Sequence, residues 1–330
     1  MNKSILPLRL TRLRARAQSR ALVRETQLLP DQLIMPLFIS EQIATRQPIH
    51  AMPGQYQLAL GDLAEEIEEL SQLGINAVLL FGIPQAKDSC GSASWHDDGI
   101  IQQAIRKIRA VNQDILIITD VCFCEYTDHG HCGVLTQQNI NNDETLKLLA
   151  RQAVSYAQAG ADWVAPSSMT DGMVQTIRNA LDAHNFNHIP ILSYSVKYSS
   201  CLYGPFREAA LGAPQFGDRK SYQMDPGNRM EALREAKLDV AEGADMIMVK
   251  PAGYYLDIIA LLKNQLPEVP LCAYQVSGEY SMIKVAAQHQ LIHEEQAMLE
   301  SLTAIKRAGA NFIISYFAKD YARLFKQTWK

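Results

Sequence analysis

The chain contains no stretch that approaches the roughly 18 unbroken apolar residues of a membrane-spanning helix, and no apolar signal-peptide core stands at its start. Cysteine is scarce, with 6 residues in 330, which excludes a disulfide-stapled scaffold. The net charge of −4 argues against a general nucleic-acid binder. We therefore expect a cytoplasmic globular protein, with neither nucleic acid nor membrane as a partner.

Acidic residues are absent from the first 24 positions, which hold seven basic ones instead: Lys3, Arg9, Arg12, Arg14, Arg16, Arg20 and Arg24. A mitochondrial transit peptide has such a composition, and a solvated, frayed terminus would be the simplest alternative. We favour a third interpretation, in which residues 1–30 form an arm that lies on a neighbouring subunit. Residues 31–330 then form one domain, since a single α/β barrel commonly fills roughly 250 residues.

No Gly-x-Gly-x-x-Gly follows the first apolar run, so nothing supports dinucleotide binding. A different motif recurs, in which a glycine and two turn residues precede an apolar strand, at Gly74, Gly160, Gly243 and Gly309. Glycine suits the left-handed position after a helix, and strands with little polar alternation are covered on both faces. The pattern predicts eight strands, at residues 33–38, 77–81, 115–119, 163–165, 189–194, 246–249, 271–276 and 312–316.

Helical patterns lie between most of these strands, at residues 62–73, 143–159, 229–241, 254–264 and 294–308. Asp62 and Asp143 are the expected N-caps of the first two. Alternating strands and helices imply a parallel sheet, and eight repeats favour a closed (β/α)8 TIM barrel of the α/β class over an open doubly wound sheet.

Residues 198–228 break this rhythm, with glycine or proline at seven positions. A long ordered loop in a compact domain is usually functional. Because this segment follows the fifth strand at the catalytic end of the barrel, we expect an active-site lid, in preference to a floppy insertion.

Polar side chains follow several predicted strands, and the C-terminal ends of barrel strands share one face. They are Asp120, Ser167, Lys197, Lys250, Ser277 and Tyr316. Burial after the apolar run 246–249 would lower the pKa of Lys250 and leave a nucleophilic amine, and a neighbouring Lys197 would lower it further. This predicts Schiff-base chemistry, although a lysine can also snorkel outward from a strand end.

Three cysteines lie within eleven residues after the third strand: Cys122, Cys124 and Cys132. Three thiolates with an open fourth position suit a catalytic zinc ion. His129 and His131 lie between the thiols and could be alternative ligands or could donate hydrogen bonds to the metal-binding thiols. A fortuitous thiol cluster is the other interpretation.

The lid carries two arginines, Arg207 and Arg219. A guanidinium group binds a carboxylate bidentately, so both suit an acidic substrate. Solvated surface charge is the alternative for either residue.

Together these features resemble the porphobilinogen synthase (5-aminolevulinate dehydratase) family, through most of the chain. The matching segments are 22–26, 35–38, 52–54, 119–122, 126–132, 203–207, 216–224, 243–251 and 274–279. Two lysines with this lid between them are highly specific to that family.

The resemblance implies that two 5-aminolevulinate molecules condense to porphobilinogen with loss of two waters, in tetrapyrrole (haem) biosynthesis. Lys250 would form the Schiff base with the first-bound substrate, Lys197 would engage the second, and Asp120 would assist proton transfers. The substrate-binding residues implied are Ser167, Tyr203, Arg207, Arg219, Gln223, Tyr274, Ser277 and Tyr316.

Metal ions and assembly also follow from the resemblance. Cys122, Cys124 and Cys132 match the zinc site of the zinc-using branch. Glu235 matches an acidic position that binds an activating magnesium at a subunit interface in many bacterial members. The family typically forms homo-octamers in which N-terminal arms embrace neighbouring subunits.

The chain departs from the family pattern after the fourth strand. The family usually reads Pro-Ser-Asp-Met-Met-Asp-Gly-Arg, whereas this chain has Ser168 and Met173 in place of the first acid and the arginine. A class I aldolase-type barrel would need one lysine and no metal, so the second lysine and the cysteines oppose it. A zinc-storing or regulatory barrel without activity is supported only by Ser168 and is opposed by the intact lysines.

Overall fold

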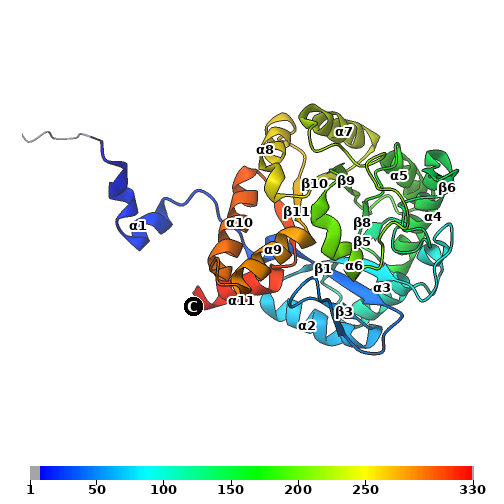
Figure 1. The fold of residues 1–330 in the computed structure, drawn as a ribbon, viewed down its shortest axis with the longest axis horizontal. Helices are drawn as coiled ribbons and strands as arrows, with labels where there is room; N and C mark the ends of the chain where they lie inside the picture. Colours follow the sequence, from blue (N-terminus) through cyan, green and yellow to red (C-terminus); the bar gives the residue numbers. More distant parts are fainter. Residues whose placement is uncertain (1–7, 329–330) are drawn as a thin grey trace, which may run out of the picture.

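The computed structural model describes residues 8–328 and arranges eight parallel strands in a barrel (Figure 1). They are β1 (Leu33–Ser40), β4 (Ala77–Ile83), β5 (Leu116–Val121), β8 (Trp163–Pro166), β9 (Leu192–Lys197), β10 (Met246–Lys250), β11 (Leu271–Gln275) and β12 (Phe312–Ser315). Consecutive barrel strands pair from β1 to β8 and from β9 to β12, and β12 pairs with β1. A parallel bridge between Val164 and Ile191 joins the two remaining edges. The expected (β/α)8 barrel is therefore confirmed.

The recurring glycine motif works as its sequence predicts. Gly74, Gly160, Gly243 and Gly309 follow helix ends with φ angles of 80°, 105°, 108° and 127°. This region is unfavourable for residues with a Cβ atom. The strands that come after are buried on both faces, and β4 and β10 are buried along their whole length.

Helices surround the barrel (Figure 1). They are α2 (Leu63–Leu73), α3 (Ile100–Val111), α4 (Asn142–Ala159), α5 (Met173–Ala183), α7 (Arg229–Glu242), α8 (Leu256–Gln265), α9 (Ser277–Gln288), α10 (Glu294–Ala308) and α11 (Ala318–Thr328). Within residues 8–328, none of the helices combines the length and apolar character needed to cross a bilayer.

Three local expectations need correction. Asn141, not Asp143, is the N-cap of α4, because its side-chain oxygen accepts the Glu144 N–H at 3.2 Å. Asp62 is the N-cap residue of α2, as expected, but its carboxylate makes no capping bond to that helix and instead accepts the Ala59 N–H at 2.8 Å, in the 3-10 turn Leu60–Asp62. The predicted strand 189–194 is three residues too early, because β9 begins only at Leu192. Ile189 belongs to the preceding turn, and Ile191 lies outside β9, in the isolated bridge to Val164.

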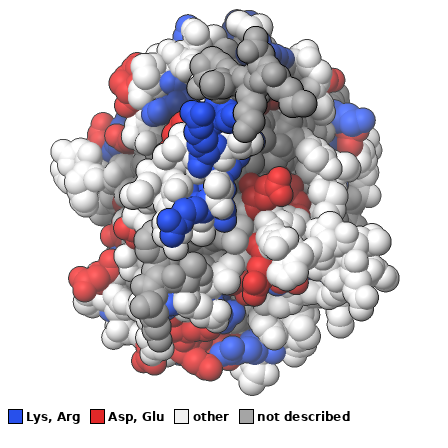
Figure 2. Space-filling view, turned by 90° about the vertical axis from the view of Figure 1, so that its left-hand side faces the viewer, with Lys and Arg blue, Asp and Glu red and all other residues white. Residues whose placement is uncertain are grey.

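Residues 8–24 form an arm that projects away from the barrel (Figure 1). It contains a 3-10 turn (Leu10–Arg14) and α1 (Ala17–Leu22), and neither buries a residue. Leu8, Leu10, Leu13 and Leu22 are 56–87% exposed. Figure 2 looks onto this side of the molecule and shows a band of basic side chains. The expected basic residue Lys3 lies outside the described part of the chain.

The segment 198–228 covers the C-terminal end of the barrel and includes the short helix α6 (Gly204–Ala209). Its two ends meet at the two candidate lysines, since the Tyr198 N–H donates to the Lys250 carbonyl (2.9 Å) and the Met224 N–H donates to the Lys197 carbonyl (3.1 Å). Side chains of the barrel loops also bind its backbone. Gln57 donates to the Ala209 carbonyl at 2.7 Å.

Candidate active site

Lys250 and Lys197 end neighbouring strands and are paired in register. Both are buried, with 6% and 4% of their surface exposed. The Lys197 ammonium donates to the Ser167 carbonyl at 2.5 Å, while Lys250 has no such partner among the described residues. Burial, helped by the charge of Lys197, lowers the pKa of Lys250 to about 7. A neutral, nucleophilic amine is therefore available at Lys250 near neutral pH.

Aromatic rings surround the Lys250 ammonium. Its Nζ lies 4.5 Å from the ring centroid of Tyr274, 5.0 Å from Tyr194, 5.2 Å from Phe206 and 5.3 Å from Tyr203. Such a cage excludes water and still tolerates a cation, because the ring faces are electron-rich.

Tyr194 is not among the site residues predicted from the sequence. On a regular strand, Tyr194 and Lys197 would face opposite sides, because they are three residues apart. The pairing of β9 with β10 shifts register between Ile247 and Val249, so that β9 carries an extra residue opposite β10. This bulge brings the Tyr194 ring to within 5.5 Å of the Lys197 Nζ.

Asp120, at the end of β5, lies in the same buried region. Ser167 donates a hydrogen bond to its Oδ2 at 3.0 Å, whereas its Oδ1 has no partner among the described residues. Burial and the nearby Glu125 carboxyl raise the pKa of Asp120 to about 7, against the opposing charges of Lys197 and Lys250. The structure thus brings together four of the predicted residues: both lysines, Asp120 and Ser167.

The three cysteines converge as expected. Cys122, Cys124 and Cys132 are buried, and their Sγ atoms all lie within 4.8 Å of one another, with 3.5 Å between Cys122 and Cys124. Tetrahedral zinc with Zn–S bonds of about 2.3 Å would hold its sulfurs about 3.8 Å apart, so the trio fits such an ion. Contacts with the other two thiols, aided by the charge of Arg219, lower the pKa of Cys132 well below its usual value.

Neither histidine of the cysteine loop joins this trio. His131 lies within hydrogen-bonding distance of the Phe216 carbonyl (3.1 Å) and the Tyr222 hydroxyl (3.2 Å), both on the lid. His129 faces the Ser89 carbonyl at 3.3 Å. These histidines connect loops in the structure. Among residues 8–328, the only other group of three possible ligands is Asp120, Cys122 and Glu125.

The lid places cationic and amide groups over the lysines and thiols. Arg219 is 5% exposed, and its Nη2 donates to the carbonyls of Gly130 (2.8 Å) and Gly212 (2.7 Å). The bond to Gly130 fastens the lid to the cysteine loop, and the bond to Gly212 lies within the lid. The buried Nε atoms of Arg207 and Arg219 have no partner within the described chain, and neither has either amide atom of Gln223. Burial and the adjacent Arg219 lower the pKa of Arg207.

The remaining predicted substrate residues lie at the ends of β11 and β12 and on the lid. The hydroxyls of Tyr274 and Tyr316 meet at 3.0 Å. Ser277 Oγ accepts the Phe206 N–H at 2.9 Å, which links α9 to the lid. Tyr203 donates to the carbonyls of Tyr198 (2.6 Å) and Lys250 (3.2 Å), so it supports the backbone of the lysine.

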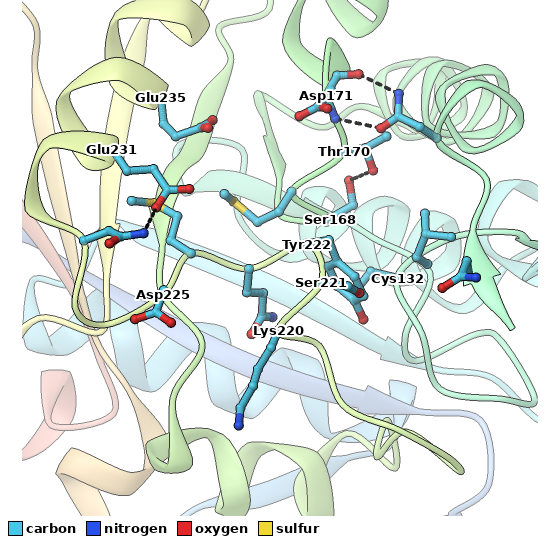
Figure 3. Close-up of a pocket in the computed structure, with 17 residues that line it drawn as sticks. Cys132, Ser168, Thr170, Asp171, Lys220, Ser221, Tyr222, Asp225, Glu231 and Glu235 are labelled. Carbon is cyan, nitrogen blue, oxygen red and sulfur yellow. Dashed lines mark hydrogen bonds between the residues drawn. The ribbon is translucent and has the colours of Figure 1, made fainter.

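Glu235 lies apart from these residues, on α7. It lines a cavity of about 520 Å³ that leads from Cys132 past Ser168 to Glu231 and Glu235 (Figure 3). Burial and the acidic neighbours Asp239, Asp171 and Glu231 raise the pKa of Glu235 to about 7. No set of three converging ligand atoms within residues 8–328 includes Glu235, so the chain by itself does not complete a metal site there.

Comparison with known proteins identifies the family. Residues 8–324 match the family model of delta-aminolevulinic acid dehydratase. The chain belongs to this family. It is 54% identical to the delta-aminolevulinic acid dehydratase of Halalkalibacterium halodurans and 53% identical to that of Bacillus subtilis, each over 312 residues. These alignments cover 94% of this chain and 95% and 96% of the relatives.

A solved structure of a family member gives the same result. The porphobilinogen synthase of Toxoplasma gondii, crystallised with its reaction product porphobilinogen, superposes with a TM-score of 0.94 at 42% sequence identity. The match covers 97% of this chain and 92% of that chain. The family expected from the sequence motifs is therefore confirmed.

Proposed function

We propose that this dehydratase-family enzyme condenses two molecules of 5-aminolevulinate to porphobilinogen, with loss of two waters, in tetrapyrrole biosynthesis. The observation that carries the proposal is the buried Lys250, with its lowered pKa, beside Lys197 inside an aromatic cage. A simple Schiff-base aldolase would have no use for the second buried lysine and the thiol trio. The family assignment and the product-bound relative support the same activity.

Lys250 is the residue that attacks the ketone of the first substrate. Its neutral amine forms the C–N bond, and loss of water gives an imine, which makes the neighbouring C–H bonds more acidic for carbon–carbon bond formation. Ser277 and Tyr316 are assigned to the carboxylate of this substrate. We assign Asp120 to hold or move a proton near Lys250, which its hydrogen bond from Ser167 and its raised pKa support.

The lid is assigned to the second substrate. Buried donors without a partner cost free energy, so the free Nε atoms of Arg207 and Arg219 and the free Gln223 amide favour an anionic ligand between them. Lys197 engages the same substrate from the barrel side. Tyr203 and Tyr274 keep water away from the reacting groups.

Zinc is the metal we assign to Cys122, Cys124 and Cys132, because three converging thiols suit zinc and leave one position open. When bound, zinc would polarise a carbonyl oxygen or lower the pKa of a water. We also assign Glu235 to a magnesium ion that keeps most of its water ligands, as magnesium commonly does. Water ligands would then complete the coordination at Glu235, where the chain offers few ligands of its own.

A homo-octamer is the assembly we propose, in the cytoplasm. The arm supports self-association, because its exposed leucines have no core of their own and its six-residue helix is too short to be stable alone. A neighbouring subunit would cover these leucines.

Borohydride trapping tests the proposed function. Reduction in the presence of 5-aminolevulinate should fix a covalent adduct on Lys250, and the wild-type enzyme should release a pyrrole product. Lys250→Met should keep the fold and lose turnover, and Lys250→Arg should not restore it, because a guanidinium stays protonated. An adduct found only on Lys197, with an active Lys250→Met variant, would reverse the roles of the lysines. A wild-type enzyme that forms neither adduct nor pyrrole would refute the function.

A further inference from the structure

One hydroxyl of the aromatic cage, that of Tyr194, makes no hydrogen bond within residues 8–328. Tyr194 is 0% exposed, yet its Oη has no hydrogen-bond partner among the described residues. The Tyr203 hydroxyl donates to a carbonyl, and the hydroxyls of Tyr274 and Tyr316 bind each other. A buried polar group left unpaired is unfavourable, so the Tyr194 hydroxyl weakens the ligand-free protein unless a ligand uses it.

The ring that carries this hydroxyl lies beside the amines of both lysines. The Tyr194 ring lies 5.0 Å from the Lys250 Nζ and 5.5 Å from the Lys197 Nζ. Burial and the adjacent Asp120 carboxyl raise the pKa of Tyr194, which keeps it a neutral O–H donor. The Oδ1 atom of Asp120 also has no partner with the geometry of a full hydrogen bond among the described residues, although the Asp120 carboxyl is close enough to act on the Tyr194 hydroxyl. A free donor and a free acceptor therefore border the space beside Lys250.

We propose that the Tyr194 hydroxyl is a further catalytic group, which donates a hydrogen bond to the ketone oxygen of the substrate bound at Lys250. The proposal rests on the function assigned above. When the Lys250 nitrogen bonds to the ketone carbon, the carbonyl electron pair moves onto the oxygen. That oxygen then takes the proton that the nitrogen loses, which gives a neutral carbinolamine. A donor fixed beside the oxygen stabilises the charge that develops in this step.

The Tyr194→Phe variant tests this role, because it removes only the hydroxyl and keeps the ring of the cage. The ligand-free variant should melt at the same temperature as the wild type or higher, since no hydrogen bond is lost. Borohydride trapping of 5-aminolevulinate on Lys250 should slow by about a hundredfold to a thousandfold, as expected for one lost donor to a developing oxyanion.

Tyr280→Phe is the matched control. This buried tyrosine lies on α9, and its hydroxyl donates to the Pro53 carbonyl at 2.6 Å. Its loss should lower the melting temperature while leaving the trapping rate within about twofold of the wild type, because a structural hydrogen bond is removed away from the lysines.

The outcomes separate the two proposals. Trapping by Tyr194→Phe at the wild-type rate would overturn the assignment of the hydroxyl and leave the proposed function intact. A melting temperature lowered as much as in Tyr280→Phe would show that the hydroxyl has a structural partner, which also overturns it. Absence of any adduct in the wild-type enzyme would contradict the proposed function and this inference with it.

Discussion

Lys250 and Lys197 are register partners on adjacent parallel strands, and both are buried. Two ammonium groups in such a position repel each other, and desolvation acts on each of them. Lys197 keeps a carbonyl partner, the Ser167 oxygen, whereas Lys250 is enclosed by rings. Burial and the neighbouring charge therefore disfavour the ammonium form of Lys250, which leaves its amine neutral and reactive.

This relationship predicts a pH dependence. Lys250 has a pKa of about 7, so its neutral amine is depleted below pH 7, and trapping should fall about tenfold for each unit further down. Lys197→Met removes one repelling charge and should raise the pKa of Lys250, which moves this acid limb to higher pH. Trapping rates measured from pH 5.5 to pH 9 locate the acid limb in the wild-type enzyme and in Lys197→Met. An acid limb at the same pH in both proteins would show that Lys197 does not influence Lys250.

Metal removal gives the second prediction. Purified enzyme should contain zinc, and Cys124→Ser should lose most of it, because a hydroxyl is a poor ligand compared with a thiolate. Metal analysis and the absorption of a cobalt-substituted sample report on the thiolates without an activity assay. Cys201→Ser is the control, since Cys201 is an exposed thiol on the lid, outside the trio. Full turnover by zinc-free enzyme would contradict a catalytic role of the metal.

The lid arginines give the third prediction. Arg207→Met should raise KM for 5-aminolevulinate by about tenfold to a hundredfold, because a hydrogen bond to a charged group contributes roughly 1.5–3 kcal/mol. Stability should change little, since Arg207 Nε has no partner in the described chain. Lys220→Met removes an exposed lid charge and should leave KM unchanged. An unchanged KM in Arg207→Met would remove the arginine from the substrate site.

Much of this site was predictable, for physical reasons. The glycine motif fixes where each helix ends and each strand begins, and a closed barrel then gathers all strand ends on one face. Residues directly after a strand, such as Lys250 and Asp120, are therefore brought together whatever the loops do. The thiol trio was predictable in the same way, because its members follow one strand at short spacing.

Other features depend on three-dimensional detail that periodicity does not encode. The bulge in β9 reverses the alternation of its side chains, and a regular strand would have placed Tyr194 on the other face. The contacts of Arg219 with the carbonyls of Gly130 and Gly212 depend on how the lid folds back. The sequence left His131 as an alternative metal ligand or as a hydrogen-bond donor to the thiol ligands, and only the fold shows that it contacts the lid instead.

The arm gives the fourth prediction. Deleting residues 1–24 should reduce the oligomer mass measured by light scattering, because exposed leucines on an arm without a core must pack on another chain to stay ordered. Replacing Leu10 and Leu13 with serine tests the apolar contribution alone and should weaken assembly in the same direction. An unchanged mass for both proteins would show that the arm takes no part in assembly.

The last prediction concerns Ser168 and Met173, the two departures from the family pattern. The structure puts them in contact: Ser168 Oγ lies 3.6 Å from Met173 Sδ, and both residues are buried. The family pattern that the sequence resembles has an acid and an arginine at these positions, whereas this chain has a neutral pair. Ser168→Asp alone should destabilise the enzyme by about 3 kcal/mol, because a buried charge is left unpaired. Adding Met173→Arg should recover at least about 1 kcal/mol of this loss, since contacting residues couple. Denaturant unfolding of both single variants and the double variant measures this coupling. Strictly additive losses would show that the two positions are independent.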